Sequence, residues 1–153
     1  MTPSPHRRPA GSARHRIELL PSVPSRFGDT IFFSPLLSDE TLIAEIAPTQ
    51  GGELFCHRHQ TDQLMVLKGE MDLVVVEQGR LRSLTLREGD GTWLRIPPCV
   101  PHGAINRGQN PVLLVNAVLR HGVSDPRDYL PRPVPIALRQ QWQRLLLPPA
   151  KLG

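Results

Sequence analysis

The middle of the chain consists of short apolar segments separated by turns that contain glycine or proline. Segments of this length and spacing, with turn residues between them, predict the strands of a sandwich or barrel. The sequence therefore indicates an all-β fold. We expect strands at residues 17–20, 30–33, 42–46, 54–59, 63–67, 71–76, 81–86, 92–96, 103–106 and 112–120.

Two of the expected strands are apolar on both faces. In 63–67 and in 71–76, apolar side chains occupy positions of both parities. A strand of this kind is covered on both sides. One face is expected to line the barrel interior, and the other to pack on a second sheet or on another subunit. A homodimer is the expected assembly on this argument.

The last part of the chain has a different pattern. Residues 124–135 contain four prolines, and 136–147 follow with Leu138, Trp142, Leu145 and Leu146 at helical spacing. We expect a short helix whose apolar face packs on the barrel or on a partner subunit. A lid over a site is the alternative role for this helix.

Charge divides the chain into a basic tail and a neutral remainder. The sequence has 18 basic and 14 acidic side chains, and four arginines but no acid lie in residues 1–16. This segment is rich in proline and lacks apolar periodicity, so we expect it to be disordered. A transit peptide is also rich in arginine, but residues 1–16 lack its amphipathic stripe. The expected organisation is a tail at 1–16, a β-barrel at 17–123, and a proline-rich crossing with a C-terminal helix at 124–153.

Composition also limits the location and the partners. A nucleic-acid-binding domain carries its positive charge on a folded face, whereas here the excess lies in the tail. No apolar run reaches the ~20 residues of a membrane-spanning helix. Cys56 and Cys99 do not form a disulfide framework and are interpreted as free thiols in a reducing compartment. We therefore expect a cytoplasmic protein without nucleic-acid or membrane partners.

Three of the six histidines are candidates for a metal site. Within a strand, His57 and His59 would point to the same face and could chelate one ion together. His102 lies in a later turn and is the candidate third ligand. Imidazole suits Zn, Cu, Fe and Ni. A solvated surface pair is the alternative explanation of a His-x-His sequence.

The spacing around these histidines resembles the two motifs of the cupin superfamily over residues 42–120. The first stretch contains Gly51, His57, His59, Gln63 and Gly69, and the second contains Gly91, Pro97, Cys99, His102 and Asn106. The resemblance implies a jelly-roll barrel, also called a double-stranded β-helix. It also implies one divalent metal (Fe, Mn, Ni, Cu or Zn), held by His57, His59 and His102 with Gln63 as fourth ligand. Asn106 and Cys99 are then expected near this metal without binding it directly.

The sequence departs from the cupin motifs at three points. Gln63 replaces the usual glutamate, Cys99 replaces a glycine, and the spacing from position 63 to Gly69 is one residue shorter than usual. A neutral amide leaves the charge of the ion uncompensated. We therefore expect an anionic small molecule as the ligand, and tighter metal binding after Gln63→Glu.

Three function classes remain open, and we assign no catalytic residue. The first is a metal-dependent enzyme, dioxygenase-like or isomerase-like, that acts on a small molecule. The second is a metal-free carbohydrate epimerase, which needs a paired acid and base, often with tyrosine; this chain has one tyrosine, Tyr129. The third is a non-catalytic cupin that binds or senses a small ligand.

Overall fold

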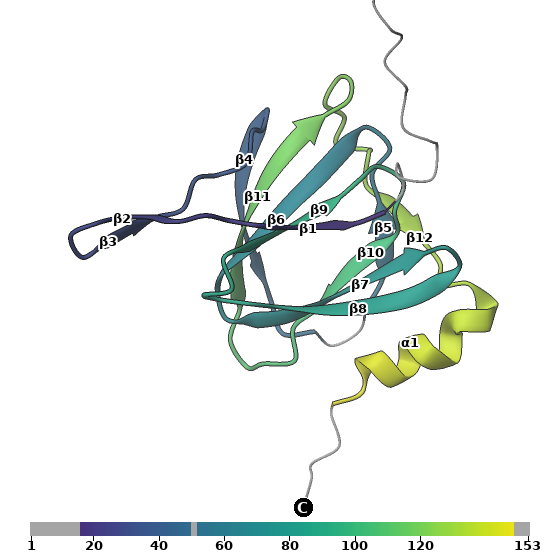
Figure 1. Cartoon of the computed structure of the whole chain (residues 1–153). Helices are drawn as coiled ribbons and strands as arrows, with labels where there is room; N and C mark the ends of the chain where they lie inside the picture. The colour runs from purple at the N-terminus through teal and green to yellow at the C-terminus, as the bar shows by residue number, and fades with distance from the viewer. Residues whose placement is uncertain (1–15, 50–51, 149–153) are drawn as a thin grey trace, which may run out of the picture.

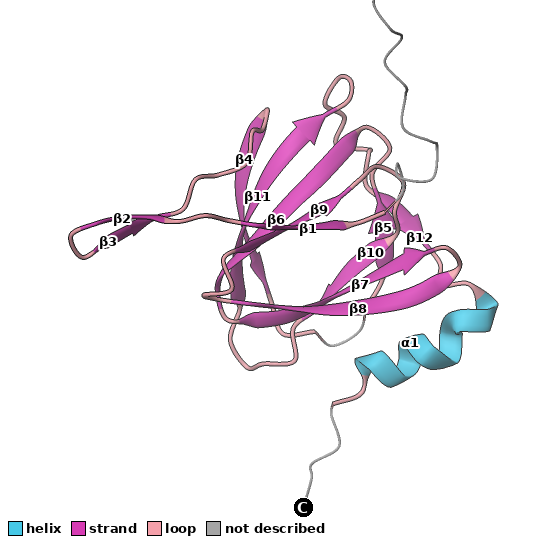
Figure 2. Cartoon of the chain, in the orientation of Figure 1, coloured by secondary structure: helices cyan, strands magenta, loops and turns pink. Residues whose placement is uncertain are grey.

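Two five-stranded antiparallel sheets face each other and form a jelly-roll barrel (Figure 1; Figure 2). The structure is a computed structural model that describes residues 16–49 and 52–148. The first sheet has the strand order β1 (Glu18–Pro21), β9 (Thr92–Ile96), β6 (Gln60–Lys68), β11 (Val112–Arg120) and β4 (Glu40–Ile46). The second has the order β12 (Leu130–Arg132), β5 (Leu54–Cys56), β10 (His102–Ile105), β7 (Glu70–Glu77) and β8 (Arg80–Arg87). The predicted all-β jelly-roll fold is confirmed.

The main core lies between the two sheets. Leu64 and Val66 of β6 point into it and meet Leu73 and Val75 of β7. Because side chains alternate along a strand, the residues between them must face outward. Met65 accordingly packs on the outer side of the first sheet, in a second cluster with Trp93 and Ala117.

The chain itself covers the outer faces of both sheets. Leu20 of β1 and Leu36, from the segment before β4, pack against the cluster around Met65. On the other sheet, Val74 of β7 packs with Trp142 of the C-terminal helix. The apolar pattern on both faces of β6 and β7 is therefore satisfied within one subunit and does not require a partner.

The predicted C-terminal helix is present and packs on the second sheet. A single 3-10 turn, η2 (Ile136–Leu138), leads into α1 (Arg139–Leu146). Leu138, Leu145 and Leu146 pack with Trp142 against this sheet. A Cβ atom added to Gly52 would lie 2.7 Å from Cζ2 of Trp142, so the close contact requires glycine.

A separate hairpin projects from the barrel. The strands β2 (Ser25–Phe27) and β3 (Thr30–Phe32) pair only with each other and extend away from both sheets (Figure 1). Their apolar side chains remain uncovered in one subunit; Phe27 is 82% exposed and Phe32 is 54% exposed. The barrel also continues past its expected end at residue 123, because β12 pairs with β5.

Two sequence-based expectations concern the chain as a whole. The expected disordered tail falls on residues 1–16, of which 1–15 lie outside the described residues. In the part of the chain that the structure describes, no helix is long and apolar enough to span a membrane.

Candidate metal centre

The chain bends where a continuous strand was expected. β5 ends at Cys56, and residues 57–59 form a bend before β6 begins at Gln60. The alternation rule for strands therefore does not apply to His57 and His59. The side chain of His57 lines the cavity inside the barrel. His59 lines a separate surface hollow beside Gly122. A Cβ atom added to Gly122 would lie 4.0 Å from Nδ1 of His59.

Asp62 is the third residue whose side chain lies beside those of His57 and His102. This residue lies on β6 with its side chain pointing into the barrel, and it is only 4% exposed. Its Oδ2 atom lies 3.4 Å from Nε2 of His57 and 3.3 Å from Nε2 of His102. One ligand atom from each of the three residues lies within 4.8 Å of the other two. Two imidazoles and a carboxylate therefore converge at one point.

Main-chain carbonyl groups orient both imidazoles. Nδ1 of His102 lies 2.8 Å from the carbonyl oxygen of Val100, and Nδ1 of His57 bonds the carbonyl oxygen of Asp128. A carbonyl only accepts hydrogen bonds, so both Nδ1 atoms must be donors. In the neutral ring this leaves the Nε2 lone pair free, which is the arrangement commonly found in metal-binding histidines.

The other carboxylate oxygen of Asp62 is held by two amides. Oδ1 accepts hydrogen bonds from Nε2 of Gln60 at 2.6 Å and from Nδ2 of Asn116 at 3.0 Å. Burial acts to raise the pKa of the Asp62 carboxyl, but hydrogen bonds from His102 and His57, which require a proton on Nε2 of each ring, outweigh it and hold this pKa far below its usual range. Asp62 is therefore an ionised carboxylate inside the barrel.

The three residues open onto a cavity of about 420 Å³ between the sheets. Its walls come from strands β4, β5, β6, β7, β10 and β11, with Tyr129 from the segment before β12. The volume falls within the range of about 300–1,000 Å³ typical of small-molecule sites. This cavity is therefore the candidate ligand site.

Gln63 lies on the opposite face of β6 from Asp62, and its expected role as a ligand is contradicted. Its side chain is fully buried: Nε2 donates to the carbonyl oxygens of Leu37 and Ala117, and Oε1 accepts a bond from Nε of Arg95. All its hydrogen-bonding groups are thus used outside the barrel interior. The charge argument that predicted tighter metal binding after Gln63→Glu loses its basis.

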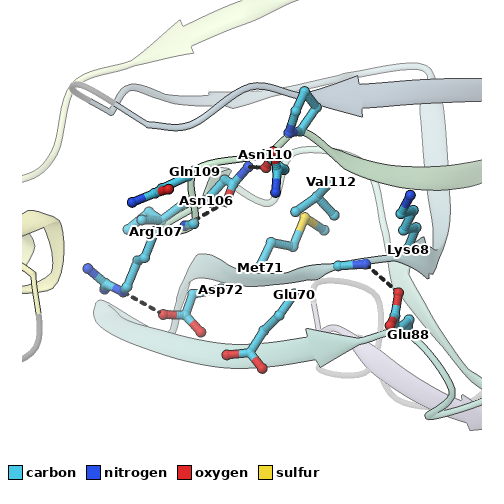
Figure 3. A pocket seen from close by; sticks show the side chains of 14 residues that line it. Lys68, Glu70, Met71, Asp72, Glu88, Asn106, Arg107, Gln109, Asn110 and Val112 are labelled. Atoms are coloured by element: carbon cyan, nitrogen blue, oxygen red, sulfur yellow. Dashed lines mark hydrogen bonds and ion pairs between the residues drawn. The ribbon is translucent and has the colours of Figure 1, made fainter.

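Asn106 lies at the far end of β10 from His102, in a second hollow at the other end of the barrel (Figure 3). Its Nδ2 atom donates to the carbonyl oxygens of Ile46 and Asn110, and its Oδ1 atom accepts from the main-chain N–H of Gly108. These bonds shape a turn. The expectation that Asn106 lies near the metal is therefore wrong.

Cys99 lies closer to the candidate metal centre, and it contacts this region through its main chain. Its N–H donates to the carbonyl oxygen of His57 at 2.6 Å, while the residue itself is exposed. Its sulfur is not one of the atoms that converge with the two histidines. Cys99 has a φ of 65°, a backbone conformation that favours glycine, which explains why the cupin motif has a glycine there.

The sequence contained a signal for Asp62, but the spacing from His59 in the first motif pointed to position 63 instead. The interval from position 63 to Gly69 is one residue too short for the motif, and counting from position 62 removes this departure. Parity gives the same answer, because Asp62 shares the inward face of β6 with Leu64 and Val66. The role of Asp128 had no signal, because it lies 71 residues beyond His57 and acts through its main chain.

Two inward histidines and a carboxylate meet between the facing sheets of a jelly-roll barrel, which is the architecture of a cupin. Residues 42–118 match the Cupin domain family, and the chain belongs to this family. Part of the chain is also similar to a 3-hydroxyanthranilate 3,4-dioxygenase from Meyerozyma guilliermondii, with 37% identity over 70 residues. This match spans 45% of the present chain and 40% of that dioxygenase.

Solved structures with the same fold include several sugar isomerases. The TDP-quinovose 3,4-ketoisomerase of Campylobacter jejuni superposes with a TM-score of 0.63 at 12% identity, over 84% of this chain and 97% of that one. A dTDP sugar isomerase of Desulfovibrio desulfuricans G20 gives a TM-score of 0.61 at 21% identity, over 79% and 86% of the two chains. At these identities the likeness supports the fold alone.

Proposed function

We propose that this cupin binds one divalent transition metal between His57, Asp62 and His102, and that it is a dioxygenase-like or isomerase-like enzyme acting on a small molecule in the adjacent cavity. The convergence of three hydrogen-bond acceptors carries the proposal. The Nε2 atoms of His57 and His102 approach the same oxygen of Asp62 within 3.4 Å, and in a neutral imidazole with its proton on Nδ1 the Nε2 atom is an acceptor. Such groups repel one another unless a cation, either a metal ion or a proton, lies among them.

The ligand types favour a particular group of metals. Two histidines and one carboxylate with open positions are typical of non-haem Fe(II) oxygenases, so Fe(II) is the expected ion, with Mn, Ni, Cu and Zn as alternatives. When bound, such a metal supplies a Lewis acid and, for iron, a site for oxygen chemistry. The partial similarity to a dioxygenase supports the oxidative alternative.

The protein's own residues orient the ligands and keep water away. Gln60 and Asn116 fix the plane of the Asp62 carboxylate through its Oδ1 atom. Arg120 in turn donates to Oε1 of Gln60 at 2.7 Å, which fixes the orientation of that amide. The apolar walls of the cavity, including Leu64 and Leu114, exclude water from the side that faces the ligand.

A proton can take the place of the metal, and this defines a second candidate function. Burial lowers the pKa of His57, but hydrogen bonding and attraction to Asp62 outweigh it, so the net shift is upward. A protonated His57 beside an ionised Asp62 would be an acid–base pair for a metal-free isomerase. The names of the structural neighbours, which are sugar isomerases, agree with this alternative.

Elemental analysis of the full chain, purified without a histidine tag and then exposed to each candidate metal, distinguishes the two functions. We expect about one metal per chain in the wild type and a loss of at least ten-fold in affinity after Asp62→Asn. Asp72→Asn is the matched control, because Asp72 pairs with Arg107 in the hollow at the other end of the barrel. A wild type that binds none of these metals would overturn the proposal in favour of the acid–base function.

Turnover separates an enzyme from a non-catalytic binding or sensor protein. The metal-loaded protein is to be assayed for oxygen consumption and for isomerisation with a panel of small cyclic acids, phenols and keto sugars. We expect one of these activities in the wild type and its loss in Asp62→Asn. Ligand binding without turnover of any compound would favour the sensor class.

A further inference from the structure

Apart from Tyr129, the polar side chains of the cavity are gathered at one end. His57, Gln60, Asp62, His102 and Asn116 line it, and the other four all bond or pair with Asp62. They therefore form one network rather than several scattered contacts. A ligand meets this network with one end only.

The rest of the cavity wall is apolar. Leu42, Ala44 and Ile46 of β4 form one side, and Met71 and Leu73 of β7 contribute to the opposite side. Most of a bound molecule would therefore contact hydrocarbon side chains, where unpaired polar groups are costly.

Aromatic rings form one boundary of the cavity. Phe55 stacks on Tyr129 with ring centroids 4.3 Å apart and an interplanar angle of 23°, and it lies 4.5 Å from the ring of His102. Tyr129 is half exposed, so it lies at the rim while Phe55 continues the aromatic surface inward to the histidine. Such a surface suits the flat face or edge of a ring.

Cationic side chains are missing from this wall. Among the described residues that line the cavity, none is a lysine or an arginine. Arg120, which lies behind Gln60, is already engaged by Gln60 and by Glu40. Apart from the proposed metal, a diphosphate group transferred into this site would lose its water without gaining the charge-assisted hydrogen bonds that usually bind phosphate.

We infer that the cavity takes a compact, ring-sized, largely apolar molecule with a single acidic or hydroxyl head directed at His57, Asp62 and His102, and that it excludes nucleotide-linked sugars. This inference rests on the proposed metal site, because a metal is needed to attract an acidic head toward the carboxylate of Asp62. An apolar cavity of roughly 150 Å³ holds a benzene ring. The present cavity, at about 420 Å³, holds a substituted ring.

Calorimetric titration of the zinc-loaded full chain tests the inference, because zinc is redox-inert and does not turn the probe over. The probes are benzoate, acetate and thymidine diphosphate. We expect benzoate to bind more tightly than acetate by roughly ten-fold or more, because its ring buries apolar surface. Thymidine diphosphate should show no binding at concentrations that saturate with benzoate.

Two variants place the benzoate site in the cavity. Ala104→Phe and Ala44→Phe each fill the space between the sheets from a different strand. Both should weaken benzoate binding at least ten-fold while the zinc content stays at the wild-type level. Ala47→Phe is the matched control, because Ala47 is exposed just beyond β4 and does not line the cavity. The second filling variant keeps the test valid if one of them fails to fold.

The outcomes separate the inference from the proposed function. If zinc binds but thymidine diphosphate binds more tightly than benzoate, or the filling variants bind benzoate normally, the substrate class is wrong and the metal site stands. If no zinc binds, another of the candidate metals replaces it; if none of them binds, the proposed metal function fails, and phenol replaces benzoate as a neutral probe of the metal-free protein. Phenol binding that both filling variants abolish would then support the apolar ring site, and unchanged binding would overturn it.

Discussion

Asp62 and Gln63 are neighbours on one strand, yet they serve different parts of the molecule. Asp62 points into the barrel and meets two histidines, whereas Gln63 points outward and bonds two carbonyl groups. The difference follows from the two-residue period of a strand. Chemical resemblance between glutamine and the glutamate of the motif favoured Gln63, but the direction of the side chain decides which residue can reach a metal.

Substitution of Gln63 should therefore affect stability rather than metal binding. In Gln63→Glu the side chain loses the N–H groups that donate to Leu37 and Ala117, and a carboxylate becomes buried beside Arg95. We expect the free energy of unfolding to fall by about 1–3 kcal/mol, as measured by urea denaturation. Metal affinity should not change. A tighter metal site in this variant would show that residue 63 does influence the ion.

Cys99 gives a second prediction at the scale of one residue. A side chain in the left-handed region costs roughly 1–2 kcal/mol, and glycine avoids most of this cost. Because Cys99 has a φ of 65°, Cys99→Gly should raise the free energy of unfolding by about 1 kcal/mol. Cys99→Ala is the control, since it removes the thiol and keeps the strain. Equal stability of both variants would point to an effect of the sulfur instead.

At the scale of elements, the segment before β12 completes the candidate metal centre. The main-chain carbonyl of Asp128 bonds His57, and its carboxylate accepts hydrogen bonds from the N–H groups of Arg58 and His59 at 2.7 and 3.0 Å. One residue thus fixes the bend between β5 and β6 and orients one imidazole. A segment that the sequence presents as a proline-rich crossing is therefore a support of the site.

Removal of the Asp128 carboxylate should loosen His57. We expect Asp128→Ala to weaken metal binding by roughly ten-fold, the lower end of the effect of groups that orient metal ligands. Competition with a chelator of known affinity measures the change. Asp125→Ala is the matched control, because Asp125 is partly exposed and pairs with Arg127 instead. Equal affinities in the two variants would show that the main chain alone holds the histidine.

The sequence predicted elements better than it predicted their ends. The period of two and the glycine turns located strands such as β6 and β11, because burial imposes that pattern directly. The bend at residues 57–59 was missed because it depends on Asp128, which lies about 70 residues away along the chain. The sequence correctly brought His57 and His102 together. Identifying Asp62 required knowledge of the strand register, and placing His59 required knowledge of the bend.

At the scale of the whole molecule, the homodimer stays a prediction with a different basis. The outer faces of β6 and β7 are covered by the chain's own segments, so they give no argument for a partner. The projecting hairpin does give an argument for a partner, because Phe27 and Ile31 are exposed on it. Ile43, on the sheet edge strand β4, is also 63% exposed. We propose that this hairpin packs on a second copy of the chain.

Charge placed on the hairpin should then separate the subunits. We expect the wild type to sediment as a dimer and Phe27→Asp to weaken the association by at least ten-fold, as measured by sedimentation equilibrium. Val123→Asp provides the control, because Val123 is equally apolar and 91% exposed but lies in the loop after β11. A wild-type protein that sediments as a monomer at all concentrations would contradict the prediction.

The support of His57 by Asp128 also sets the order in which the protein matures. During synthesis His57 leaves the ribosome 71 residues before Asp128, whose main chain holds its imidazole. Contacts between such distant parts of a chain form late, after the loop that separates them has closed. We infer that a metal bound at His57 would enter after the barrel has formed, so that apolar burial rather than the ion would drive folding. The amount of folded protein would then not depend on the supply of the ion.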